Sequence, residues 1–174
     1  MISTRFFIAA LPRSRTAWLS QFFCAGDVFC LHDGLNRYPN KESLSRAMSG
    51  THRAYGNADS GLMFSQFQDW FDAPTLVIER DEGEVYESLV DLFGSAEWAL
   101  VREMSDRLKK VTGLRIPYSE INDRLEEIWS YCVGDGYDHL RGESMKRMKI
   151  ETTEIHGNPE SFREVASWLG YTRV

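Results

Sequence analysis

Blocks of apolar residues in this chain alternate with segments that place apolar residues at helical spacing. The run over residues 5–11 is almost entirely apolar, which is typical of a central parallel strand buried on both faces. From Thr16 to about Gly26 the apolar positions recur at helical spacing, which predicts a helix. Residues 28–31 predict a second short strand, and residues 75–79 form the clearest strand of the chain. Strands that alternate with helices in this way predict an α/β fold with a small parallel sheet.

Weaker signals cover the rest of the chain. A helix over residues 82–93 follows the clearest strand and places Val85, Leu89, Leu92 and Phe93 on one face, and we expect Val85, Leu89 and Leu92 to face the core. The pattern as a whole predicts a single domain over residues 1–174 with a mainly helical C-terminal half. The other predicted elements are a polar loop over 32–40, helices over 41–48, 96–111, 118–131 and 159–169, a strand over 51–55, a turn over 57–61 that caps a helix running through Trp70, and a short strand near 148–151.

Composition narrows the classes of partner and compartment. The chain has 174 residues and a net charge of −6, which argues against nucleic acid or an anionic membrane as partner, because both require a positive field. No apolar run reaches the length of a membrane-spanning helix. The N-terminal apolar run is short and leads into arginines, unlike a signal peptide. Three cysteines without metal-ligand spacing favour free thiols, a cytoplasmic protein and no structural metal.

A polar turn over residues 12–16, with the sequence PRSRT, joins the first predicted strand to the first predicted helix. Backbone N–H groups and the positive end of the helix dipole converge at such a turn, which is where α/β proteins bind phosphates. The turn has neither glycine nor lysine, so it does not fit the G-x-x-x-x-G-K-[ST] loop of nucleotide triphosphatases. Its two arginines either bind an anion or are solvated loop residues, with Trp18 a core residue.

The turn and the start of the helix resemble the sulfotransferase family. In that family a strand is followed by P-[KR]-S-G-T-[TS]-W-L, which wraps the 5′-phosphosulfate of the donor 3′-phosphoadenosine 5′-phosphosulfate. Residues 12–19 of this chain read PRSRTAWL and depart from the motif at Arg15, where the family usually has glycine, and at Ala17, where it usually has a hydroxyl residue. The matching positions are Pro12, Arg13, Ser14, Thr16, Trp18 and Leu19.

A second pair of residues supports the resemblance. In sulfotransferases a later strand ends in arginine, and that arginine grips the donor's 3′-phosphate together with a serine in the following helix. Here Arg80 follows the strand over 75–79, and Ser88 lies inside the next predicted helix. Arginine offers a fork of donors to phosphate, although an arginine after a strand is also a common ion-pair partner. We expect the strand over 75–79 to lie parallel beside the strand over 5–11, so that Arg80 reaches the sheet edge of Arg13.

The resemblance covers the chain up to about residue 90 and implies a three-layer, P-loop NTPase-like fold with a small central parallel sheet flanked by helices. It implies a sulfotransferase that moves a sulfuryl group from 3′-phosphoadenosine 5′-phosphosulfate to a hydroxyl or amine acceptor, with no metal. Arg13 would stabilise the transferred group, Arg15 and Thr16 would hold the 5′-phosphate, and Trp18 would pack near the adenine. The implied donor-binding residues are Arg13, Ser14, Arg15, Thr16, Ala17, Trp18, Arg80 and Ser88.

Such a reaction needs a base that accepts the proton of the acceptor. The second predicted strand ends beside His32 and Asp33, which places both at the sheet edge of the loop. We favour His32 as the base, with Asp33 as its orienting group or as the alternative base; the competing interpretation is that His32 merely ends a strand. Asn57, Asp59 and Ser60 form the next polar turn, which either contacts a substrate or simply caps a helix.

The acceptor is the least constrained part of the prediction. The chain is short for the family and lacks the glycine-rich R-K-G-x-x-G segment that many cytosolic members use over the adenosine. Acceptor-binding segments are therefore reduced or are supplied by a second copy of the chain in a homodimer. The expected acceptor is a small molecule or a glycan. Two other functions stay open, namely a small kinase-like phosphotransferase and a nucleotide-binding module without activity.

Overall fold

The computed structural model describes residues 4–64 and 70–134, and the predicted elements at 148–151 and 159–169 lie outside these residues. The strands are β1 (Thr4–Ala10), β2 (Val28–His32), β3 (Ala54–Asp59), β4 (Thr75–Glu79) and β5 (Leu114–Pro117). The helices are α1 (Thr16–Phe23), α2 (Gly34–Arg37), α3 (Lys41–Ala47), α5 (Glu82–Phe93), α6 (Trp98–Leu108) and α7 (Leu125–Val133), with short 3-10 helices η1 (Ser60–Phe64) and η2 (Tyr118–Glu120).

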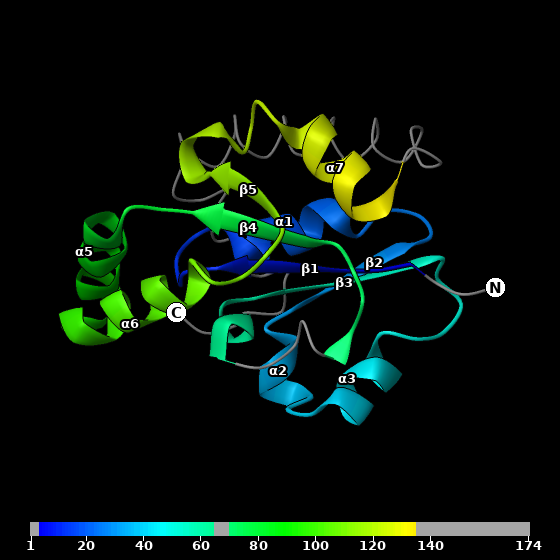
Figure 1. The fold of residues 1–174 in the computed structure, drawn as a ribbon, viewed down its shortest axis with the longest axis horizontal. Helices are drawn as coiled ribbons and strands as arrows, with labels where there is room; N and C mark the ends of the chain where they lie inside the picture. Colours follow the sequence, from blue (N-terminus) through cyan, green and yellow to red (C-terminus); the bar gives the residue numbers. More distant parts are fainter. Residues whose placement is uncertain (1–3, 65–69, 135–174) are drawn as a thin grey trace, which may run out of the picture.

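The five strands form one parallel sheet in the order β2-β3-β1-β4-β5. The central strand β1 pairs with both β3 and β4, so that Phe7 lies opposite Asn57 on one side and Thr75 on the other. This confirms the predicted α/β fold and the predicted position of the strand over 75–79 beside the first strand. Because all strands run in the same direction, their carboxyl ends meet at one edge of the sheet (Figure 1).

Helices cover both faces of the sheet and give the protein three layers (Figure 1). Successive residues of β1 point to opposite faces. Phe6 and Ile8 belong to the core formed with α1 and α7, which includes the fully buried Trp129. Phe7 and Ala9 belong to the core formed with α3, η1, α5 and α6. Since both faces of β1 are covered, the strand appears in the sequence as a continuous apolar run.

The region around β3 differs from its sequence prediction. The strand spans Ala54–Asp59 rather than residues 51–55, and the predicted turn over 57–61 is wrong because Asn57 and Asp59 are strand residues. Both are buried, with exposed fractions of 0% and 2%, and their side chains accept hydrogen bonds from backbone N–H groups of α2 and η1. Asparagine and aspartate favour turns by propensity, but here tertiary hydrogen bonds place them at the end of a buried strand.

The sequence prediction also misses β5. This strand pairs with β4 through Leu76 and Leu114, and the predicted helix over 118–131 begins only at Leu125 as α7. A strand of this length carries almost no periodic signal, so its pairing with β4 defines it. Gly113 makes the close approach of the two strands feasible, because a Cβ atom at that position would collide with the carbonyl oxygen of Thr75.

Helix α5 has the predicted bounds, but only part of its predicted apolar face reaches the core. Val85 is fully buried, whereas Leu92 has an exposed fraction of 53%, so the prediction is wrong for Leu92; Phe93, on the same apolar face, is 69% exposed. The helix stands beyond the carboxyl edge of the sheet, and its last turn lies away from the central strands (Figure 1). Among the described residues, no helix is long and apolar enough to cross a membrane.

Candidate anion-binding site

The loop between β1 and α1 holds two arginines in an unusual backbone conformation. Arg13 has a φ angle of 64° and Arg15 has a φ angle of 62°, both in the left-handed region. This conformation costs a residue other than glycine about 1–2 kcal/mol. Local strain of this kind clusters at binding and catalytic sites. At Arg15 it coincides with the position at which the sulfotransferase motif usually has glycine, so the backbone path suits that motif although the side chain differs.

The N-terminus of α1 and the preceding serine form a site suited to an anion. No side chain caps the helix, and its first turn contains no acidic residue. The first N–H groups of a helix have no partner within the helix, and the helix dipole makes this end positive. Ser14 is fully buried, and its Oγ has no hydrogen-bond partner among the described residues. A buried hydroxyl without a partner costs about 1–3 kcal/mol, and an oxyanion held in the loop would supply the missing acceptor.

The two sequence features that carry the sulfotransferase resemblance meet at this loop. Arg13 donates a hydrogen bond from Nε to Oγ of Ser88 at 3.1 Å. Arg80 donates from Nη1 to the carbonyl oxygen of Arg13. Arg80 and Ser88 therefore both contact Arg13, from which they are separated by 67 and 75 residues in the sequence. The parallel pairing of β1 with β4 produces this arrangement, because it brings the two carboxyl ends to the same edge.

Aromatic rings hold two of the arginines. The guanidinium carbon of Arg80 lies 4.3 Å from the centre of the Tyr118 ring, and that of Arg15 lies 5.0 Å from the same centre. Arg15 also lies over Trp18, at 5.7 Å, and donates from Nη1 to Oδ1 of Asn122 at 3.1 Å. Its side chain therefore reaches across the loop to the segment after β5. None of these partners of Arg15 carries a negative charge.

His32 and Asp33 lie at the same edge, on the β2 side of the loop. Nε2 of His32 is 3.3 Å from Oγ1 of Thr16, the first residue of α1, and 3.5 Å from Oδ2 of Asp33. The side chains of His32 and Asp33 are 33% and 38% exposed, so a solvent-borne molecule can reach both. Asp33 itself has a φ angle of 51°, which places a third strained residue at this edge. The predicted base thus adjoins the predicted anion loop.

The polar residues at the end of β3 serve the fold around the site. Oδ1 of Asn57 accepts a hydrogen bond from the N–H of Gly34 at 3.0 Å. The Asp59 carboxylate accepts one from Leu35 at 2.7 Å and one from Gly61 at 2.6 Å. Burial raises the pKa of Asp59, while these two backbone hydrogen bonds oppose the rise. Ser60 begins η1. The first two side chains thus fix the start of α2 beside His32.

Trp18 and Ala17 occupy different environments. Trp18 is partly buried, packs against the core and stacks on Phe22 with ring centres 6.0 Å apart. The Trp18 ring therefore contributes to the core through Phe22, and it also contacts the guanidinium group of Arg15. Ala17 is exposed at the start of α1, close to the helix end that would receive an anion.

Sequence reasoning missed three residues that contact the site. Tyr118 and Asn122 follow β5, which was not predicted as a strand, and Glu84 pairs with Nε of Arg80 at 3.2 Å. The available signal was the short segment LRIP directly after Gly113, which is compatible with a strand and would have placed Tyr118 at the carboxyl edge. The pairing with Glu84 could be predicted from its four-residue separation from Arg80 at the start of α5.

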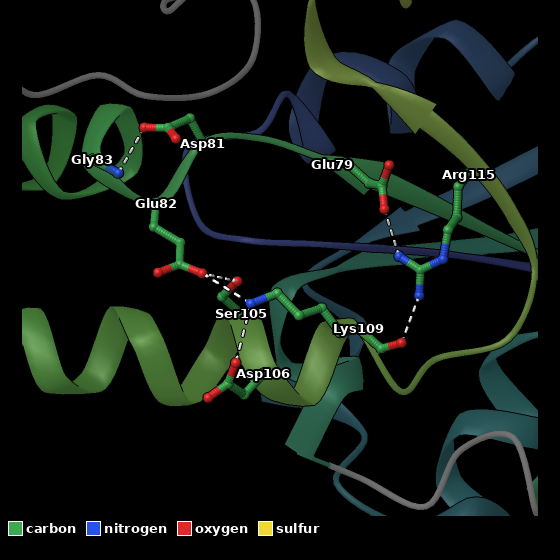
Figure 2. Close-up of polar contacts among 8 residues, drawn as sticks. All are labelled: Glu79, Asp81, Glu82, Gly83, Ser105, Asp106, Lys109 and Arg115. Carbon is green, nitrogen blue, oxygen red and sulfur yellow. Dashed lines mark hydrogen bonds and ion pairs between the residues drawn. The ribbon is translucent and has the colours of Figure 1, made fainter.

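A cavity of about 530 Å³ borders Arg80 between the ends of β4 and β5 and helices α5 and α6. Two of its cations, Lys109 and Arg115, are paired with carboxylates, as Figure 2 shows. Nη1 of Arg115 lies 2.7 Å from Glu79, and Nζ of Lys109 lies 3.1 Å from Glu82. Hydrogen bonds from the hydroxyl of Ser105 and from Lys109 hold the pKa of Glu82 below its ordinary value. The polar lining therefore consists largely of groups that already neutralise one another.

Metal-ligating side chains do not gather in the part of the chain that the structure describes. Within residues 4–64 and 70–134, no group of three or more His, Cys, Asp or Glu side chains could hold a metal ion. All three cysteines are free, and burial raises the pKa values of Cys30 and Cys132. The functional side chains that the described residues bring to the candidate site are arginines, hydroxyl groups, His32 and Asp33.

Comparisons with known proteins support the fold. No family model matches the sequence, and no curated protein matches it. Among solved structures, the chain is similar to a mouse sulfotransferase, SULT7A1, complexed with PAP, with a TM-score of 0.51 and 13% sequence identity. The similarity covers 91% of this chain and 67% of that chain. At this identity the likeness is one of fold, and the protein has a sulfotransferase-like α/β fold with a five-stranded parallel sheet flanked by helices.

Proposed function

We propose that this protein is a sulfotransferase that moves a sulfuryl group from 3′-phosphoadenosine 5′-phosphosulfate to a hydroxyl or amine acceptor. The observation that carries the proposal is the meeting of Arg80 and Ser88 with Arg13 at the N-terminus of α1. A loop that binds only a nucleoside triphosphate has no reason to place a second arginine and a hydroxyl for a 3′-phosphate. The similarity of fold to a sulfotransferase that was crystallised with PAP agrees with this assignment.

The donor's two anionic ends would be held by different elements. The 5′-phosphosulfate would lie in the β1–α1 loop, where it would meet the N–H groups at the N-terminus of α1, the hydroxyl of Ser14 and the side chain of Arg13. The 3′-phosphate would lie against Arg80 and Ser88. Nη2 of Arg80 has no hydrogen-bond partner within residues 4–64 and 70–134, so part of the guanidinium remains available. Arg15 adds positive charge beside the loop, and Trp18 would flank the adenine.

Sulfuryl transfer resembles phosphoryl transfer, in which charge builds on the leaving oxygen in a loose, in-line transition state. Arg13 is the group that would stabilise this charge, because its exposed guanidinium stands over the loop. The hydrogen bond to Ser88 fixes its Nε and leaves the two terminal nitrogens for the substrate. Electrostatic stabilisation by such a positioned donor is commonly worth about a hundred- to a thousandfold in rate.

His32 would act as the base. To accept a proton at Nε2 the imidazole must carry its hydrogen on Nδ1, and in that tautomer the Thr16 hydroxyl donates to Nε2. Asp33 lies beside the same nitrogen, so it does not orient the ring through Nδ1. Its carboxylate would instead stabilise the imidazolium that forms when His32 takes the proton. This geometry disfavours the orienting role expected for Asp33, supports a role in stabilising the imidazolium instead, and leaves Asp33 as the alternative base.

The expected acceptor is a hydroxyl or amine on a small molecule or glycan, and it would approach from the side of His32. A second copy of the chain in a homodimer remains our proposal for supplying acceptor contacts that a short chain lacks. No nucleic acid or membrane is required for this reaction. We expect the reaction to take place in the cytoplasm, a compartment compatible with both the donor and the free thiols of the chain.

The test separates the 3′-phosphate from the rest of the nucleotide. Losing a hydrogen bond to a charged phosphate costs about 1.5–3 kcal/mol, or roughly ten- to a hundredfold in affinity. We expect Arg80→Ala to weaken adenosine 3′,5′-bisphosphate by that factor in isothermal titration, and to leave adenosine 5′-monophosphate almost unchanged. Arg115→Ala is the control, because Arg115 lies within the adjacent strand β5, opposite Val77, and its charge is paired with Glu79.

Equal losses for both nucleotides would contradict the assignment of Arg80 to a 3′-phosphate. Tight binding of ATP with magnesium, and none of the bisphosphate, would instead favour a phosphotransferase. If the bisphosphate binds as expected, a sulfate-transfer assay against a panel of hydroxyl and amine acceptors distinguishes an enzyme from a nucleotide-binding module without activity.

A further inference from the structure

Tyr118 occupies a position that the sequence did not single out, between two arginines of the candidate site. The guanidinium carbon of Arg80 lies 4.3 Å from the centre of its ring, and that of Arg15 lies 5.0 Å away. Both distances are within the range of a favourable cation–π contact. The two cations come from different segments of the chain, one from the β1–α1 loop and the other from the end of β4.

The strand register explains how Tyr118 reaches this place. Glu79 of β4 pairs with Pro117 of β5, so the residues that follow them, Arg80 and Tyr118, leave two adjacent strands at the same level. Arg80 is only 15% exposed, and the ring covers part of it. The placement of Tyr118 is therefore a consequence of the pairing of β5 with β4.

Two guanidinium groups held at one edge repel each other, and flexible arginine side chains would otherwise separate. An aromatic face attracts both without neutralising either, because its electron-rich surface carries no net charge. Two hydrogen bonds also fix these arginines without neutralising their charge: Arg80 donates to the carbonyl oxygen of Arg13, and Arg15 donates to the side-chain amide oxygen of Asn122. Glu84 is the carboxylate that contacts Arg80, and at 59% exposure it is well screened by solvent.

We propose that Tyr118 is a positioning residue of the donor site: its ring holds the guanidinium groups of Arg15 and Arg80 together at the carboxyl edge of the sheet, so that both are aligned for a dianionic nucleotide. This inference rests on the proposed function for its consequence in binding, but the stack itself is a property of the protein alone. The phenol oxygen has no part in it. The ring is what matters, and this distinguishes positioning from hydrogen bonding to a ligand.

The first measurement concerns the arginines and needs no ligand. Side-chain protons of an arginine over an aromatic ring are shifted upfield by the ring current. We expect such shifts for Arg15 and Arg80 in NMR spectra of the wild-type protein, assigned with Arg15→Lys and Arg80→Lys. The shifts should persist in Tyr118→Phe, which keeps the ring. In Tyr118→Leu, which keeps an apolar side chain without a ring, the shift of Arg80 should vanish and that of Arg15 should fall to the part that Trp18 contributes.

The second measurement is the affinity for adenosine 3′,5′-bisphosphate. Losing two cation–π contacts predicts that Tyr118→Leu binds roughly five- to thirtyfold more weakly, whereas Tyr118→Phe binds like the wild type. Tyr131→Leu is the matched control, because this α7 tyrosine accepts a hydrogen bond from Leu114 at 3.2 Å and supports the same strand. It should lower the melting temperature without lowering affinity in proportion.

The outcomes separate this inference from the proposed function. Absence of the upfield shifts in the wild type would overturn the stack, and wild-type affinity in a folded Tyr118→Leu would overturn its positioning role. If Tyr118→Phe loses as much affinity as Tyr118→Leu, the phenol oxygen is the active group and the inference is wrong. If the wild type binds no bisphosphate while the shifts are present, the proposed function fails and the stack stands.

Discussion

Two groups of cations lie at the carboxyl edge of the sheet, and they differ in what holds them. Around the β1–α1 loop, Arg13 contacts a hydroxyl group, and Arg15 contacts an amide and two aromatic rings. On the side of α5 and α6, Lys109 and Arg115 contact carboxylates, as Figure 2 shows. The two groups have the same kind of charge and nearly the same position in the fold, but only the second is neutralised.

The difference indicates which cations are available to a ligand. A carboxylate partner cancels a cation's field at short range, whereas a neutral partner fixes the side chain and leaves its charge exposed to an incoming anion. The net charge of −6 therefore says little about this edge, because the local arrangement determines the field. Arg80 connects the two groups, with an exposed carboxylate on one side and a carbonyl oxygen and an aromatic ring on the other.

The largest expected effect comes from removing a cation of the first group. Arg13→Ala should lower the rate of sulfuryl transfer at least about a hundredfold, because its charge acts on the leaving oxygen. The melting temperature should hardly change, since Arg13 is exposed and lies outside the core. Turnover with labelled donor and calorimetry on the same samples check both statements. Arg107→Ala, which removes an exposed cation paired with Glu103 in α6, is the control.

Wild-type turnover in a folded Arg13→Ala protein would mean that an exposed, carboxylate-free arginine at this edge has no role in the reaction. It would also remove the distinction drawn between the two groups of cations. A fall in turnover with Arg107→Ala of the same size would show that general charge, rather than position, controls the rate.

The next effect tests the β2 side of the loop, where a base rather than a cation is proposed. His32→Ala should lower the turnover number about a hundredfold or more and leave donor affinity within a factor of about two, because a base acts in the transition state. Asp33→Asn should have a smaller effect, since its carboxylate would only support the imidazolium. Single-turnover kinetics with saturating donor provide the measurement.

Unchanged turnover in His32→Ala, with loss in Asp33→Asn, would transfer the role of base to Asp33. Unchanged turnover in both variants would remove this pair from the mechanism. A parallel loss of donor affinity in His32→Ala would show instead that its contact with Thr16 shapes the anion loop.

The sequence predicts the strands that are buried on both faces and the helix whose ends carry local capping signals. The apolar runs of β1 and β4 predict central strands, and the α5 helix is confirmed at both ends, helped by Asp81 as its N-cap and Gly94 as its C-cap. From these elements alone the sheet edge that carries Arg13 and Arg80 could be predicted, because parallel strands place their carboxyl ends together.

The sequence was uninformative where long-range contacts override local preference. Asn57 and Asp59 have turn propensities but end a buried strand, because backbone N–H groups from α2 and η1 bind their side chains. Leu92 has helical apolar spacing but is 53% exposed on α5. Tyr118 could not be placed without β5, and β5 is defined by pairing rather than by pattern. The sequence therefore predicts the two arginines of the stack but not the aromatic ring that they contact.

A smaller effect is expected from the second group of cations, on stability rather than on binding. Nη2 of Arg115 donates to the carbonyl oxygens of Leu108, Lys109 and Val111 at the end of α6, while Nη1 pairs with Glu79. Arg115→Ala leaves these groups without a donor and should lower the free energy of unfolding by about 2 kcal/mol. Nucleotide affinity should not change, because the lost charge was already neutralised.

Urea denaturation gives the stability change, and titration with adenosine 3′,5′-bisphosphate gives the affinity. Arg115→Lys keeps the charge but cannot reach several acceptors at once, so it should recover only part of the stability. A loss of affinity in Arg115→Ala comparable to that in Arg80→Ala would show that the carboxylate-paired cations also serve the ligand. The comparison between the two groups would then be wrong.

The smallest expected effect is a pH dependence confined to the second group. The Ser105 hydroxyl and Lys109 hold the pKa of Glu82 below its ordinary value in the folded protein. A carboxyl whose folded pKa is lowered stabilises the protein above its unfolded pKa, and this stabilisation is lost as pH falls through the folded value. Glu82→Gln should therefore cost about 0.5 kcal/mol near pH 7, as is usual for a solvent-screened pair, and the difference from the wild type should shrink toward zero in acid. Urea denaturation near pH 7 and in acid, with the exposed Glu87→Gln as control, measures this difference. A difference that stays constant with pH would show that the glutamate acts by packing rather than by charge.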